Sequence, residues 1–161
     1  MPSEIRGSDN FDSDSVGKVL QVVNYRTGAA ATGTTIIPRD ASIPQQTEGN
    51  QYMSLAITPK SATSFLLVNA NIGSIYNTAA ESLTMALFRD TTANALAVSS
   101  LYTVTNNGHE TLSLSHYTAS GSTSTTTFKV RAGGHQTGTT YINSPFGGVV
   151  DTSITITEIE A

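Results

Sequence analysis

One segment, residues 45–68, constrains the fold more than any other, and it reads QQTEGNQYMSLAITPKSATSFLLV. From Met53 to Thr58, large apolar side chains alternate with small or polar ones, which is the period-2 pattern of a half-buried β-strand. Pro59 interrupts the pattern, because proline fixes φ and has no N–H for a ladder. The apolar run Phe65–Val68 is long enough for a strand and too short for a lone helix. The segment therefore predicts a β-hairpin.

Short segments of this kind recur along the chain, separated by turn signals. Asn106-Asn107-Gly108 is a strong turn signal, because Asn and Gly tolerate positive φ. In the last segment, Ile154, Ile156 and Ile159 are available for burial. Besides the hairpin, we expect strands at Val19–Tyr25, Thr34–Ile37, Leu83–Phe88, Ala95–Leu101, Leu112–Tyr117, Thr125–Ala132, Thr139–Ile142 and Ser153–Ile159.

Two neighbouring segments are harder to assign. Tyr76–Glu81 is expected to be a loop. Ala79–Leu87 could form a helix by propensity, whereas Thr84 and the alternation around it favour a strand.

The composition agrees with a β-protein. Only 12% of the residues are charged, and Ser and Thr, which are poor helix formers, make up about a quarter of the chain. Eight to ten short strands without an internal repeat favour a sandwich over a solenoid or propeller. We therefore predict an all-β fold, a jelly-roll-like antiparallel β-sandwich over residues 17–161. Residues 1–16, polar and aperiodic, are expected to form a short extended N-terminal arm.

Charge and apolar pattern exclude several partners. The net charge is −4, and neighbouring Lys and Arg residues never form a run, so binding to nucleic acid or to an anionic membrane surface is not expected. No apolar run approaches the ~20 residues that cross a bilayer, and no signal peptide pattern opens the chain. Cys is absent, which excludes disulfides and thiolate metal sites. We expect a protein that is made in the cytoplasm and is soluble.

Metal-binding patterns are also missing. DSDSVG, with the nearby aspartates, loosely echoes a calcium loop, but the spacing fails at Val16 and Val23, where an EF-hand needs oxygen ligands. His109, His116 and His135 show no zinc-ligand spacing. We therefore predict no metal site and no cofactor.

Catalytic patterns are equally scarce. No serine lies in a G-x-S-x-G elbow. Paired carboxylates for glycoside cleavage would have to come from residues in loops and turns, where acidic side chains serve local hydrogen bonding. We predict that the protein is not an enzyme. The carboxylates in question are Asp40, Glu48, Glu81, Asp90 and Asp151.

The tyrosines leave two interpretations open. Tyrosine has an apolar body and a polar tip, so these residues could form a sugar-stacking platform or a subunit interface. Alternatively, they are ordinary residues at sheet ends. They are Tyr25, Tyr52, Tyr76, Tyr102, Tyr117 and Tyr141.

Four stretches carry a family resemblance: GKVLQVVN (17–24), QTEGNQYMSLAITPKSATSFLLV (46–68), MALFRDTTANALA (85–97) and SPFGGVVDTSITITEIE (144–160). In sequence and order they are similar to the β-rich C-terminal modules of tail-fibre and other particle-surface proteins of phages from marine and aquatic bacteria. The opening SEIR is similar to the start of such fibre proteins. The resemblance implies a jelly-roll-like module, often trimeric, on the outside of a virus particle. It implies no catalytic residues.

From this resemblance we expect a phage capsid decoration (cement) protein that binds the outside of the capsid as a homotrimer and stabilises it. About 16 residues precede the module, with no shaft repeat, which suits a decoration protein better than a complete tail fibre. The alternative is a receptor- or carbohydrate-binding tip of a tail fibre, with polar loops such as Asn106-Asn107 and Gln136-Thr137 contacting host-surface glycan. In the decoration protein, the arm would contact the major capsid protein or other virion proteins through Ser3, Glu4, Ile5, Arg6 and Phe11.

Overall fold

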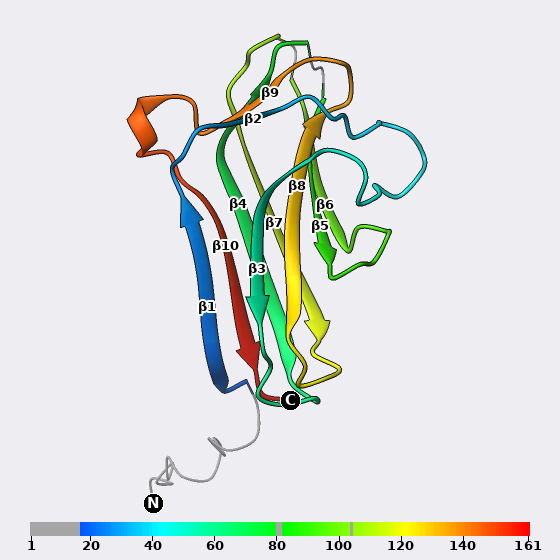
Figure 1. Cartoon of the computed structure of the whole chain (residues 1–161), viewed down its shortest axis with the longest axis vertical. Helices are drawn as coiled ribbons and strands as arrows, with labels where there is room; N and C mark the ends of the chain where they lie inside the picture. The colour runs from blue at the N-terminus through cyan, green and yellow to red at the C-terminus, as the bar shows by residue number, and fades with distance from the viewer. Residues whose placement is uncertain (1–16, 80–81, 104) are drawn as a thin grey trace, which may run out of the picture.

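The computed structural model describes residues 17–161, apart from residues 80, 81 and 104. The expected arm, residues 1–16, lies outside the described residues. In the described ranges, ten strands form two antiparallel sheets that pack face to face in an elongated, jelly-roll-like β-sandwich, which confirms the predicted fold class (Figure 1). No helix in the described ranges is long and apolar enough to cross a membrane.

The first sheet contains six strands, and its order follows from the pairing along the long strand β4 (Phe65–Asn77). β10 (Thr152–Ile159) pairs with one edge of β4, and β7 (Glu110–Ala119) pairs with the other. β1 (Val19–Thr27) lies outside β10. At one end of the molecule, beyond the ends of β10 and β1, two three-residue strands continue the sheet. β9 (Thr140–Ile142) pairs with β4, and β2 (Ala31–Gly33) pairs with β9.

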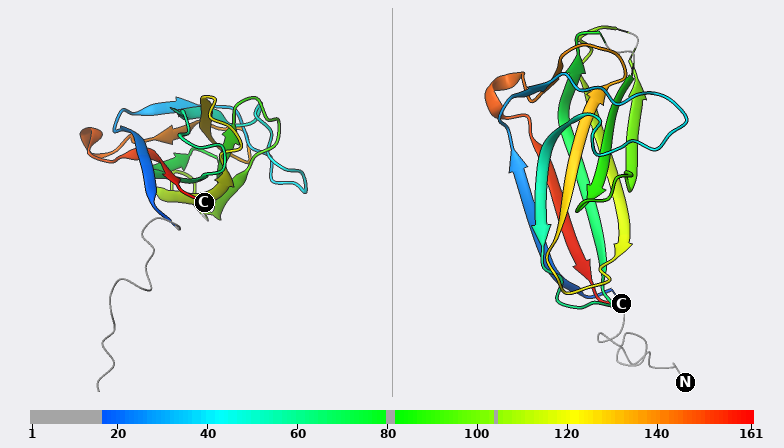
Figure 2. Two further views of the ribbon diagram at one scale, coloured as in Figure 1. Left: turned by 90° about the horizontal axis from the view of Figure 1, so that it is seen from below. Right: turned by 45° about the vertical axis from the view of Figure 1, so that its right-hand side comes forward.

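The second sheet contains four strands in the order β3-β8-β5-β6. These are β3 (Asn50–Ile57), β8 (Thr126–Gly134), β5 (Ser82–Arg89) and β6 (Ala97–Tyr102). Figure 2 shows the two sheets facing one another, with the connection between β2 and β3 looping out beside the second sheet. Ile37 in that connection is 1% exposed and packs on Ala86 and Phe88, so it covers the outer side of β5.

The core lies between the sheets and is built by strand alternation. On β4, Leu66, Val68, Ala70 and Ile72 are buried, whereas Asn69 between them is exposed. From the second sheet, mainly β8 and β5 contribute. The remaining fully buried core members include Leu83, Met85, Leu87, Phe128, Val130, Ile154 and Ile156.

The predicted hairpin at residues 45–68 is wrong, although both of its strands exist. β3 pairs with β8 and β4 pairs with β10, so the turn around the buried Pro59 carries the chain from one sheet to the other. Local alternation predicts a strand and the face that it buries, but not the strand with which it pairs.

Two further predictions are corrected. A strand was expected at Thr34–Ile37, but β2 ends at Gly33, and Ile37 instead donates its N–H to the Gly134 carbonyl at 3.0 Å. Tyr76 was expected in a loop, but β4 runs on to Asn77 because β9 pairs with its end. The helix considered near Ala79–Leu87 is not found where the structure describes that segment, which forms β5 from Ser82.

The C-terminal strand also differs in detail. Ile154 and Ile156 are buried as predicted, but the next residue on that face is Glu158, at 0% exposure, and Ile159 faces outward. The strict period of 2 required this, since Ile159 is three residues after Ile156.

The described chain enters and leaves the sandwich at one end, which we call the base. The Glu160 N–H donates to the Lys18 carbonyl at 2.8 Å. At the opposite end, the crown, the Asn107 N–H donates to the Asn77 carbonyl, and the Thr78 N–H donates to the Thr139 carbonyl. The crown thus brings together the loops around Asn107 and Gly138, which are far apart in the sequence.

Candidate functional site

The predicted attachment residues lie outside the described residues. These are Ser3, Glu4, Ile5, Arg6 and Phe11, all within residues 1–16. The candidate site described below lies on the sandwich itself.

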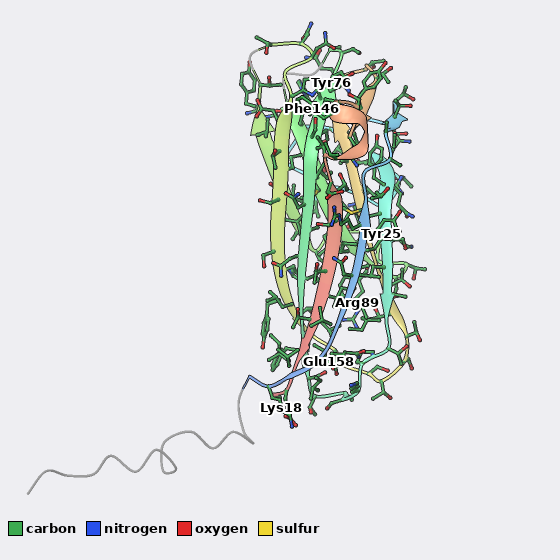
Figure 3. All side chains as sticks on the ribbon, turned by 90° about the vertical axis from the view of Figure 1, so that its left-hand side faces the viewer. Lys18, Tyr25, Tyr76, Arg89, Phe146 and Glu158 are labelled. Carbon is green, nitrogen blue, oxygen red and sulfur yellow. The ribbon has the colours of Figure 1, made fainter. Side chains whose placement is uncertain are left out.

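The most distinctive surface is the outer face of the first sheet, which we call the open face (Figure 3). It consists of Phe65, Leu67, Asn69 and Asn71 on β4 together with their cross-strand partners on β7, β10 and β1. Arg26, at the β1 edge, is the only charged residue among these described positions, and it forms an ion pair of 2.5 Å with Asp151. The open face is thus a broad sheet surface almost without charge.

Toward the base, the open face is apolar. Phe65 and Tyr117 stack with their ring centroids 4.9 Å apart and an angle of 15° between the planes. Val22 on β1 is 56% exposed, and it lies in one cross-strand row with Thr157, Leu67 and Tyr117. Exposed large apolar groups in a row of this kind commonly mark a protein interaction surface.

In the middle, the open face carries only amides and hydroxyls. Asn69 lies opposite Ser115 and Thr155, and Asn71 lies opposite Ser113 and Ser153. Because most of these side chains are short, they leave a shallow groove of about 380 Å³.

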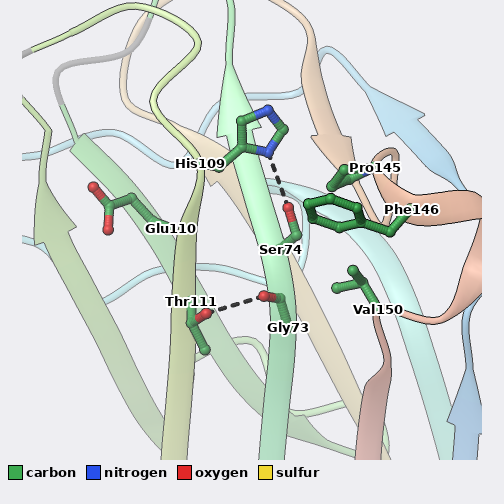
Figure 4. Close-up of a pocket in the computed structure, with 8 residues that line it drawn as sticks. All are labelled: Gly73, Ser74, His109, Glu110, Thr111, Pro145, Phe146 and Val150. Carbon is green, nitrogen blue, oxygen red and sulfur yellow. Dashed lines mark hydrogen bonds between the residues drawn. The ribbon is translucent and has the colours of Figure 1, made fainter.

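Toward the crown, a protrusion stands out from the open face. Residues 144–150 connect β9 to β10 and contain a single 3₁₀ turn, η1 (Phe146–Gly148). Phe146 and Val149 are each 78% exposed. Phe146 and Pro145 form one wall of a cleft of about 600 Å³, whose floor is Gly73 and Ser74 (Figure 4).

The other wall of the cleft comes from the start of β7. The Ser74 hydroxyl and His109 Nδ1 are 3.1 Å apart in a hydrogen bond, and the Thr111 hydroxyl donates to the Gly73 carbonyl at 3.0 Å. Glu110 also borders the cleft, but Figure 4 shows its carboxylate pointing away from Phe146. Within the described ranges, no carboxylate bonds to His109, so the Ser–His pair lacks the acid of a catalytic triad.

The remaining sequence candidates are dispersed. Asp40 bonds to Ser42, Glu48 to the Gln45 N–H, Asp90 to Thr126 and Asp151 to Arg26, so each of these carboxylates has a local partner. Glu81 lies outside the described residues. Over the described part of the chain, no group of three potential metal ligands converges. The absence of enzymatic activity and of cofactors stays a prediction.

Two of the predicted tyrosines do meet. Tyr76 and Tyr141 stack at the crown with their centroids 4.7 Å apart and an angle of 3° between the planes, and His109 packs against Tyr76 at 4.4 Å. Sequence reasoning missed Phe146, although an aromatic residue followed by two glycines in a loop is a signal for an exposed ring. It also missed Glu158, which strict alternation would have placed on the core face.

Comparison with known proteins gives a family and a fold. The family model of the Pgp3 C-terminal domain matches residues 32–159. The structure of Eiger TNF from S. frugiperda is similar with a TM-score of 0.54 at 8% identity, covering 87% of this chain and 94% of that one. At this identity the likeness concerns the fold alone. No curated protein matches the chain in sequence.

Two other solved structures have TM-scores too low to carry an argument. One is the C-terminal domain of EclA, a sugar-binding protein, with a TM-score of 0.38 at 15% identity, covering 97% of this chain and 89% of that one. The other is the VP2 subviral particle of infectious bursal disease virus, with a TM-score of 0.34 at 9% identity, covering 89% of this chain and 39% of that one.

Proposed function

We propose that this chain, which belongs to the family of the Pgp3 C-terminal domain, is a homotrimeric structural module on the surface of a bacteriophage particle. There it binds the outside of the capsid and stabilises it as a decoration protein. The open face is the observation that carries the self-association, and the sequence resemblance to phage surface modules supports both the location and the number of three copies.

The layout of the open face favours a cyclic assembly. A rotation axis parallel to the strands brings the same height of each copy together. The apolar rows around Phe65 and Leu67 of one copy then face the apolar rows of the next copy. The amides and hydroxyls around Asn69 likewise face the amides and hydroxyls of that copy. Because the face carries almost no charge, its burial leaves no unpaired ion, and an unpaired buried charge would be strongly destabilising.

The fold also indicates how the module is oriented on the particle. Residues 1–16 join the sandwich at Gly17, beside the base. If residues 1–16 hold the capsid, the base faces the capsid and the crown faces outward. Low charge and abundant hydroxyls then suit the exterior.

A specific observation favours a second candidate, the receptor- or carbohydrate-binding tip of a tail fibre. The stacked Tyr76 and Tyr141 present aromatic surface at the crown, close to the loop around Asn107. Aromatic rings with a polar tip are suited to sugar contact.

The test is the solution mass of the chain and its copy number in purified particles. We expect a mass three times the 16.9 kDa of one chain and a copy number comparable with that of the major capsid protein. Deletion of residues 2–16 should leave the trimer intact but strip it from the particle and lower the temperature at which the capsid opens.

Other outcomes separate the candidates. A few copies per particle would move the protein to the tail and make glycan-array binding, with its loss in Tyr141→Ala, the decisive experiment. A monomer in solution at micromolar concentration would contradict self-association through the open face. Unchanged particle binding after the deletion would contradict the role of the arm.

A further inference from the structure

Phe146 is in a position that the isolated chain does not explain. The residue is 78% exposed, and its φ of 62° lies in the left-handed region. A bulky residue is a true outlier there, because its β-carbon crowds the backbone, whereas Asn or Gly is tolerated. Backbone strain of this kind clusters at functional positions, where the surrounding structure holds it in place.

The protrusion is held firmly, so Phe146 is presented in a fixed place. The Asn143 side chain, 1% exposed, donates to the Thr27 carbonyl at 3.0 Å and accepts from the Thr152 hydroxyl at 2.9 Å. Gly28 packs so closely that a β-carbon on it would lie 2.0 Å from the Gly148 carbonyl oxygen. Preorganised aromatic residues on a rigid base are typical anchors of protein interfaces.

The cleft beside Phe146 is shaped to receive a side chain of similar character. Pro145 and Val150 make its near wall apolar, and the bulge at Gly73 and Ser74 opens its floor. The hydroxyls of Ser74 and Thr111 are already bonded within the chain, so the cleft offers few free polar groups. An apolar or aromatic side chain therefore fits the cleft better than a polyhydroxylated or charged ligand.

We propose that Phe146 of one copy inserts into the cleft of the neighbouring copy and locks the crown end of the trimer. This inference rests on the proposed self-association. Phe146 and the cleft lie at the same level along the strands of the open face. A rotation axis parallel to the strands therefore brings Phe146 of each copy toward the cleft of the next. Such a head-to-tail contact closes into a ring when it is repeated by rotation.

The first experiment replaces Phe146 by Asn, which tolerates the same backbone conformation. We expect Phe146→Asn to raise the dissociation constant of the trimer at least tenfold in a dilution series followed by sedimentation or mass photometry. The monomer should unfold at the same or a higher urea concentration. The matched control is Ile43→Asn, an apolar-to-Asn change at another exposed loop residue. Its neighbour Pro44 accepts a hydrogen bond from Ala95 beside the second sheet, so this variant should leave assembly unchanged.

The second experiment locates the contact. A photo-crosslinking phenylalanine analogue at position 146, in mixed isotope-labelled and unlabelled copies, should join Phe146 to the peptide carrying His109 and Thr111 of a different copy. Crosslinks confined to one copy, or a trimer unaffected by Phe146→Asn, would overturn this inference while leaving the trimer established. A monomeric wild-type chain would instead overturn the proposed self-association, and the lock with it.

Discussion

Among single residues, Glu158 has the most instructive environment. Its carboxylate is 0% exposed and accepts hydrogen bonds from Gln21, the Ser64 hydroxyl and the N–H groups of Lys60 and Ser61, at 2.6–3.1 Å. Burial alone acts to raise the pKa of Glu158, but these hydrogen bonds favour the ionised form more strongly and hold the pKa below its ordinary value of 4.5. The carboxylate thereby ties β10 and β1 to the turn that crosses between the sheets.

A lowered pKa makes this contribution dependent on pH. The stabilisation is complete above the ordinary pKa of 4.5 and is lost as the pH falls through the lower pKa of the folded chain. We expect Glu158→Gln to lower the free energy of unfolding by about 1–3 kcal/mol at pH 7, because an amide leaves buried donors unpaired. The difference from wild type should shrink in urea titrations below pH 4.5. Glu160→Gln is the control, and an equal loss in both variants would refute the argument.

Residues of this kind mark the limit of prediction from sequence. The alternation that predicts the last strand also places Glu158 on its core face. The donors come from positions 94 to 137 residues away in the chain, so no local pattern reveals them. Phe146 was missed for the opposite reason, since an irregular loop has no period from which exposure can be read.

Among the elements, β9 and β10 behave as one strand interrupted by the protrusion. Both pair with the same edge of β4, and the Asn143 N–H and the Asp151 carbonyl continue the ladder across the gap through Ser74 and Gly73. On the outer edge, β1 pairs with β10 and β2 pairs with β9, so the two strands are interrupted at the same level. Gly28 lies in the junction between them. The protrusion is therefore an insertion into a sheet and not a free loop.

This arrangement predicts a steric effect at Gly28. In Gly28→Ala the added methyl group meets the Gly148 carbonyl oxygen, so the β1–β2 junction or the protrusion must shift. Overpacking of this type costs about 1–3 kcal/mol of unfolding free energy, which chemical denaturation measures directly. The exposed neighbour provides the comparison: Ala30→Ser should change stability by less than about 0.5 kcal/mol. Equal values for the two variants would show that the junction yields without cost.

The strands themselves were largely predictable, but their partners were not. Period-2 alternation located most of the ten strands and the buried residues of β4 and β8. It could not show that β3 and β4 belong to different sheets, because pairing depends on contacts remote in sequence. The end of β4 was misplaced and β2 was not predicted at all for the same reason, since both form by pairing with β9.

In the whole molecule, charge is distributed unequally between the two sheets. The open face carries Arg26 alone, whereas the second sheet and the connection beside it carry Arg89, Lys129, Arg131 and several acids within the described ranges. Charged residues thus lie on the side of the second sheet, whereas the face that we propose as the interface is almost uncharged. No single strand reveals this asymmetry, because it appears only when the sheets are assembled.

The asymmetry yields a matched pair of variants. Asn69→Arg places a charge at the centre of the open face, and Ser54→Arg places the same charge at an exposed strand position of the second sheet. An unpaired charge buried in an interface costs about 3–5 kcal/mol, so Asn69→Arg should raise the dissociation constant of the trimer more than about a hundredfold. Ser54→Arg should not change the mass measured by light scattering. If only Ser54→Arg dissociates the trimer, the interface lies on the other sheet.

The adjacency of Lys18 and Glu160 has a consequence for how such a module spreads. With entry and exit side by side, the sandwich can be spliced into a surface loop of an unrelated protein as a cassette, because neither flanking segment has to span the domain. Recombination that moves the coding segment from one gene to another would then preserve the fold of both the recipient protein and the inserted domain. In protein engineering, the same geometry would allow a peptide to be inserted at the crown while both linkers to the host protein leave from the base.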